Sequence, residues 1–93
     1  MKGVTRLADA DSAHCSLPKR AEASLDVLVN GIGVSRQGDA NTLHDNCSDS
    51  SHITRIVAGS TTVFVNGFGC GRIGDPTGCT SVAEGSLDVL AGD

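Results

Sequence analysis

The sequence predicts a small, mainly β fold with almost no helix, in which three related units surround a pseudo-threefold axis. Three observations predict this fold class. A short apolar segment occurs three times, and strong tight-turn signals follow two of its copies. No stretch keeps the 3.6-residue apolar period of a helix over three turns. A chain of 93 residues forms one domain at most, so the units share a single fold over residues 1–93.

The recurring segment is Ser24–Leu28, which returns letter for letter as Ser86–Leu90 and more loosely as Ser60–Phe64. In each unit an arginine and, three residues later, an aspartate precede this segment: Arg6 and Asp9, Arg36 and Asp39, Arg72 and Asp75. Such spacing across a turn favours a local ion pair or an Asp-capped turn, and contact with a partner is the alternative. The units therefore span about residues 3–31, 33–67 and 69–93.

Short apolar runs bounded by glycine and serine predict the strands, at Leu25–Val29, Val63–Val65 and Leu87–Leu90. Asn30-Gly31 and Asn66-Gly67 favour tight turns, so each turn joins its strand to the following run as a hairpin. Residues 21–28 are the only tempting helix, but their repeat partners carry residues that disfavour helix. Three such units make a monomer that can offer one equivalent contact to each subunit of a homotrimer.

Composition excludes several classes of function. The net charge is −4 and the basic residues are scattered, which argues against nucleic-acid binding. The first residues lack the features of a secretory signal, so we expect synthesis in the cytoplasm without such a signal.

Phe64 and Phe68 are the only aromatic residues, so the small hydrophobic core needs further stabilisation. Four cysteines without a signal peptide favour thiols or metal ligands over disulfides.

One stretch of the chain carries a specific resemblance. Residues 59–67 read Gly-Ser-Thr-Thr-Val-Phe-Val-Asn-Gly, and residues 72–79 read Arg-Ile-Gly-Asp-Pro-Thr-Gly-Cys. With the repeat order, this pattern resembles the PAAR-repeat family, small proteins that cap the spikes of type VI secretion systems and contractile phage tails. The resemblance spans Gly3 to Asp93. Of the tetrad that names the family, the chain keeps only the arginine, at Arg36 and Arg72.

The resemblance implies a cone-shaped fold and a structural, non-enzymatic role. Such a protein sharpens a trimeric β-helical spike, contacts the target cell envelope transiently, and is delivered outside the cell at the tip of a virion tail or secretion apparatus. The sequence leaves open which of these two machines it serves. The glycine-rich turns and apolar strands are the expected docking surface, with the residues Gly31, Gly33, Val34, Gly67, Phe68 and Gly69.

The resemblance also implies one structural zinc ion near the vertex, held by three histidines and one cysteine. The matching residues are His14, His44, His52 and Cys79, with Cys15 or Cys47 as substitutes for Cys79. A lone histidine is more often a surface residue than a ligand, so the repeat register and the resemblance together carry this assignment. Zinc takes four ligands tetrahedrally, and ligands from separate loops supply folding energy that a thin core lacks.

Two other functions compete with this interpretation. A free-standing binding module or adhesin would be stabilised by disulfides and hold no metal. A metal-dependent hydrolase would need an open coordination position, which four protein ligands do not leave, and the chain lacks a nucleophile elbow. For Cys15, Cys47 and Cys70 the favoured interpretation is small, partly buried side chains or free thiols. A bridge between Cys15 and Cys47 in an oxidised virion is the alternative.

Overall fold

The computed structural model describes residues 1–13, 15–45 and 51–92. Eight two-residue strands form four antiparallel pairs, which confirms the mainly β fold, and the described ranges contain no helix. None of the described residues therefore belongs to a helix that is long and apolar enough to cross a membrane. The strands are β1 Lys2–Gly3, β2 Leu28–Val29, β3 Ile32–Gly33, β4 His44–Asp45, β5 Ser51–His52, β6 Phe64–Val65, β7 Phe68–Gly69 and β8 Leu90–Ala91.

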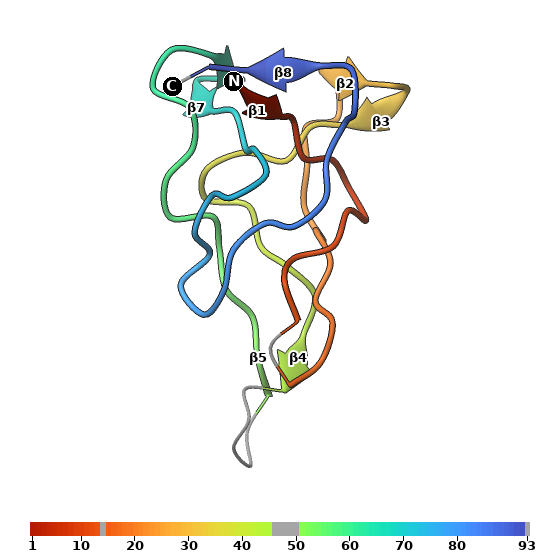
Figure 1. Ribbon diagram of the computed structural model, residues 1–93, viewed down its shortest axis with the longest axis vertical. Helices are drawn as coiled ribbons and strands as arrows, with labels where there is room; N and C mark the ends of the chain where they lie inside the picture. Colours follow the sequence, from red (N-terminus) through yellow and green to blue (C-terminus); the bar gives the residue numbers. More distant parts are fainter. Residues whose placement is uncertain (14, 46–50, 93) are drawn as a thin grey trace.

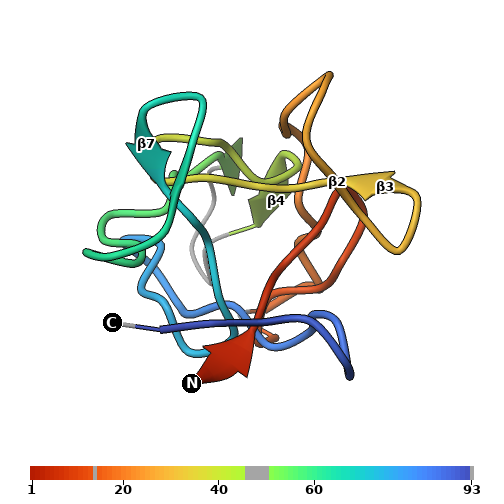
Figure 2. The same ribbon diagram turned by 90° about the horizontal axis from the view of Figure 1, so that it is seen from above.

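The molecule is elongated and tapers toward one end. Its principal extents are 37 × 23 × 23 Å. Three strand pairs, β1–β8, β2–β3 and β6–β7, lie at the wide end, whereas β4 and β5 lie at the narrow end (Figure 1). Seen from above, the chain forms three lobes around a central axis (Figure 2). The long axis of the molecule is therefore also the axis of its internal repeat.

The two Asn-Gly turns form hairpins as the sequence predicts. Asn30 and Asn66 have positive φ angles of 56° and 54°, and the turns join β2 to β3 and β6 to β7. In the third lobe the two ends of the chain take the place of a hairpin, because β1 pairs with β8.

The strands are shorter than predicted. Leu25, Asp26 and Val27 do not belong to β2, because the Ser24 hydroxyl accepts the N–H groups of Asp26 and Val27 and bends the chain there. The serines of the other two units do the same, so each strand begins at the fourth residue after its serine.

A closed triangle of backbone hydrogen bonds ties the three units together. The N–H of Thr5 donates to Gly71, that of Gly71 to Ser35, and that of Ser35 to Thr5, at 2.9–3.0 Å. Since the three residues occupy the same place in their units, the triangle marks the pseudo-threefold axis. The buried core lies next to it and repeats the same symmetry, with one set of three small apolar residues at Val4, Val34 and Cys70 and another at Val29, Val65 and Ala91.

Gly71 is the member of this triangle that tolerates no side chain. A Cβ at Gly71 would lie 2.7 Å from the Ser35 carbonyl oxygen and 2.9 Å from the methyl groups of Ile56 and Thr5. We expect Gly71→Ala to lower the free energy of unfolding by about 1–3 kcal/mol through overpacking, measured by urea unfolding. Gly92→Ala is the control, because the nearest atom to its Cβ is 3.5 Å away, and equal loss from both variants would contradict the prediction.

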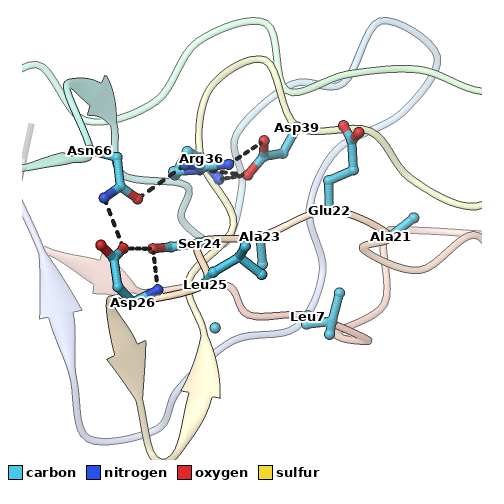
Figure 3. Close-up of a pocket in the computed structure, with 11 residues that line it drawn as sticks. Leu7, Ala21, Glu22, Ala23, Ser24, Leu25, Asp26, Arg36, Asp39 and Asn66 are labelled. Atoms are coloured by element: carbon cyan, nitrogen blue, oxygen red, sulfur yellow. Dashed lines mark hydrogen bonds and ion pairs between the residues drawn. The ribbon is translucent and has the colours of Figure 1, made fainter.

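The three Arg–Asp pairs form local ion pairs, which confirms the interpretation favoured from their spacing. At two of the three pairs, further hydrogen bonds link the arginine to the neighbouring unit, and we call each such set of contacts a corner network. Arg36 binds Asp39 and donates to Asn66, whose amide donates to Asp26, itself held by Ser24 (Figure 3). The hydrogen bonds from Asn66 and then Ser24 hold the pKa of Asp26 below its ordinary value of 3.8. Neighbouring units are thus fastened to each other at their rims.

A further ion pair, between Arg20 and Asp11, is completely buried. Arg20 Nη2 lies 2.7 Å from Asp11 Oδ2, and neither side chain is exposed to solvent. In the other two units the place of Arg20 is taken by Ile56 and Val82, as shown by their matching backbone hydrogen bonds to the positive-φ turns. At this position the interior therefore carries a charged side chain in one unit and an apolar side chain in the other two.

Candidate metal centre

His44, His52 and Cys79 come together near the narrow end of the molecule. Their ligand atoms all lie within 4.8 Å of one another. The Nε2 atoms of the two histidines are 3.0 Å apart, and Cys79 Sγ lies 3.5 Å from His44 Nε2. The antiparallel pair β4–β5 places the histidines directly opposite each other, and the loop after Asp75 brings in the cysteine from the third unit. The cluster therefore joins two units of the repeat.

The hydrogen bond of His44 prepares its other nitrogen for a metal. His44 Nδ1 lies 2.7 Å from the carbonyl oxygen of Thr42. A carbonyl oxygen only accepts, so Nδ1 must carry the proton and the neutral ring keeps a lone pair on Nε2. That lone pair faces His52 and Cys79. Metal-bound histidines are held by the same kind of outer contact, which fixes both the tautomer and the ring orientation.

The two separations measured from His44 Nε2 suit a tetrahedral zinc ion, and the third, between His52 and Cys79, is within 4.8 Å. Zinc binds nitrogen at about 2.0–2.1 Å and sulfur at about 2.3 Å, so tetrahedral angles separate two nitrogens by about 3.3 Å and a nitrogen from a sulfur by about 3.5 Å. The observed separations are 3.0 Å and 3.5 Å. Two imidazoles and a thiolate are also a donor set that zinc prefers. The residues present therefore fit the group.

The other cysteine and histidine candidates have different outcomes. His14 and Cys47 lie outside the described residues. Cys15 is disulfide-bonded, which corrects the preference for a free thiol and removes it as a substitute ligand in this state. Cys70 and Cys79 are free thiols. Burial raises the pKa of the Cys70 thiol, which is a core residue far from ionisation at neutral pH.

Sequence reasoning missed two polar residues beside the cluster, one that contacts it and one that holds this first residue in place. The Thr54 hydroxyl lies 3.3 Å from Cys79 Sγ, and the Asn41 amide donates to that hydroxyl at 2.8 Å. The one signal available was the repeat register, since Asn41 occupies the place of Asp11 and Thr77 in the other units. No spacing rule distinguishes an outer contact of this kind from an ordinary loop threonine.

The predicted docking residues are divided between surface and core. Gly31, Gly67 and Phe68 are exposed in the turns of the wide end. Val34 is only 1% exposed and Gly69 is buried, so these two support the surface from below and do not contribute to it. Gly33 is half-buried. Phe68 shares the exposed apolar surface of this end with Leu28, Phe64 and Leu90, which are 50–61% exposed.

A groove of about 810 Å³ lies beside the corner network. Its walls include Leu7, Ala21 and Leu25, and the ion pair of Arg36 and Asp39 lies within it (Figure 3). It contains none of the three candidate ligands, so the metal centre is a separate site.

No protein-family model and no curated protein matches this chain. Its function is therefore inferred from its own residues.

Proposed function

We propose that this chain is a PAAR-repeat spike-tip protein that caps a trimeric β-helical spike and carries one structural zinc ion near its point. One observation carries the proposal. The pseudo-threefold axis connects a broad apolar end to a narrow end where the His44, His52 and Cys79 cluster lies. A threefold base fits a trimer, and a metal-stapled point concentrates force on a small area. The role is mechanical and requires no catalysis.

The wide end repeats the same apolar contact in each lobe. Leu28, Phe64 and Leu90 occupy equivalent places in their units, and each is at least half exposed. Their neighbours Val29, Val65 and Ala91 face the core, so the exposed side chains point away from it. Each of the three side chains can meet one subunit of a homotrimer in the same way. A cap of this shape also covers strand edges that would otherwise be open to aggregation.

The metal explains how a thin point keeps its shape. His44 and His52 come from the second unit and Cys79 from the third, so one ion would cross-link separate loops. His14, the predicted fourth ligand, belongs to the first unit and would complete a closed site. We further propose that the protein is made in the cytoplasm, joins its spike there and reaches the target envelope on the assembled machine.

A docking experiment tests the proposed partner. We expect the protein to bind the trimeric spike protein of the same system with one chain per trimer. Phe64→Asp replaces the 61% exposed ring with a charged carboxylate and should weaken binding at least about 10-fold, since aromatic contacts dominate interfaces. Light scattering gives the stoichiometry and calorimetry the affinity.

Val57→Asp is the matched control for this experiment. Val57 is 58% exposed but lies outside the strands of the wide end, so the same change of charge should leave docking intact. Equal weakening by both variants, or no binding of the unmodified chain to any trimeric spike of its system, would remove the support for a spike tip.

The disulfide at Cys15 favours a second candidate, a free-standing binding module stabilised by disulfides. The two functions differ in what holds the fold together. A module of this class would bind no zinc, and reduction would unfold it while chelators would not. A spike tip would lose stability when its metal is removed, whatever the state of Cys15.

A further inference from the structure

A continuous polar chain connects the buried ion pair with the metal cluster. Arg20 Nη2 donates to Asp11 Oδ2 at 2.7 Å, and the same oxygen accepts from Asn41 Nδ2 at 3.0 Å. Asn41 Nδ2 also donates to Thr54 Oγ1 at 2.8 Å, and this oxygen lies 3.3 Å from Cys79 Sγ. The chain thus runs from the fully buried interior to a candidate ligand at the narrow end.

The orientation of the Asn41 side chain is determined by its partners. Its Nδ2 serves both Asp11 and Thr54, and its Oδ1 accepts the backbone N–H of Thr54 at 2.8 Å. Turning the amide over would set its oxygen against the Asp11 carboxylate and its NH2 group against the Thr54 N–H, so both of those hydrogen bonds would be lost. Asn41 is only 1% exposed, so water cannot replace them. Thr54 is therefore held at two points, its backbone and its hydroxyl.

The same contacts determine the direction of the Thr54 hydroxyl. Because Thr54 Oγ1 accepts a hydrogen bond from Asn41, its single proton is available for Cys79 Sγ. A metal-bound cysteine is a thiolate and has no proton to give. The hydroxyl must then be the donor. A donor held in this place keeps the sulfur in one rotamer and toward His44.

We propose that Thr54 is a positioning residue for the metal ligand Cys79, and that Asn41, anchored on the buried Asp11, holds Thr54 in that role. The inference rests on the proposed metal centre. It makes the metal affinity at the narrow end depend on a hydrogen bond network that begins at the buried pair of Arg20 and Asp11. Outer contacts of this kind set metal affinity by about 10–100-fold.

Cobalt(II) titration of the full chain tests this role. Thiolate-to-cobalt absorption reports the Cys79 bond directly, and zinc competition gives the affinity. We expect Thr54→Val, which keeps the shape and removes the hydroxyl, to weaken zinc binding about 10–100-fold and to alter the thiolate band. Thr54→Ser restores the hydroxyl and should restore both readouts. Thr80→Val is the control, since its hydroxyl donates to the Ser12 carbonyl and not to the cluster.

A double variant separates positioning from general stability. Asn41→Thr introduces the residue found at the same place in the third unit. As a single variant it should weaken zinc binding, but combined with Thr54→Val it should add little further weakening, because Asn41 acts through Thr54. Unchanged affinity and absorption in Thr54→Val would overturn the inference while leaving the metal centre in place. A parent chain that binds neither cobalt nor zinc would overturn the metal centre itself.

Discussion

Replacing Asp11 with threonine is expected to lower the free energy of unfolding by about 3–5 kcal/mol, because it leaves the Arg20 guanidinium buried without its partner. Both side chains of this pair are fully buried, and the only other hydrogen bond of the Arg20 side chain in the described structure goes to the Asp39 carbonyl at 3.3 Å. Threonine is chosen because the third unit carries Thr77 at this place. Urea unfolding in excess zinc measures the loss.

The partner variant makes the prediction specific. Arg20→Ile copies Ile56 from the second unit, and we expect the double variant Asp11→Thr, Arg20→Ile to regain most of the lost stability. Asp11 Oδ1 and Arg20 Nε have no hydrogen-bond partner in the described structure, so the intact pair already bears a desolvation cost. A double variant that is as unstable as the two single losses combined would show that no coupling exists between the two residues.

Removing the metal is the second change with a large expected effect. A ligand that binds only the folded chain stabilises it by about 4 kcal/mol when its free concentration is 1,000 times its dissociation constant. We therefore expect a strong chelator to lower the thermal midpoint of the parent chain, and His44→Ala to abolish that dependence. Calorimetry with and without chelator measures the difference, and elemental analysis gives one zinc per chain.

Ser51→Ala provides the matched comparison for His44→Ala. It removes an exposed hydrogen bond to Asp45 in the same β4–β5 pair but contributes no metal-binding atom. Its thermal midpoint should still fall when the chelator is added. If the parent chain melts at the same temperature with and without chelator, zinc has no structural role.

The parts of the fold that follow local rules were predicted from the sequence. The Asn30-Gly31 and Asn66-Gly67 turns set their own hairpins, and the Arg–Asp spacing sets its own ion pairs. The strand starts were wrong because Ser24 bends the chain before Leu28, although the apolar pattern continues through it. A side-chain hydrogen bond to the nearby backbone can replace the first residues of a strand, and the apolar pattern of the sequence does not reveal it.

Features that depend on contacts between units were not predictable in the same way. Arg20 follows a proline and a lysine in a polar loop, and only the folded interior reveals that it replaces an apolar residue of the other units. For the metal centre, the repeat register together with the family resemblance indicated His44, His52 and Cys79, whereas Thr54 and Asn41 carry no motif. For Cys15, the expected cytoplasmic compartment favoured a free thiol, and this prediction was wrong because Cys15 is disulfide-bonded.

The pairing of β1 with β8 has a consequence for the order of folding. The other two hairpins at the wide end close across two residues and can form early, within microseconds. The third requires the first and last strands of the chain to meet, which carries the largest loop-closure entropy in the molecule. The ring of three lobes can therefore close only after β8 has left the ribosome, so we expect its closure to be a late event of folding.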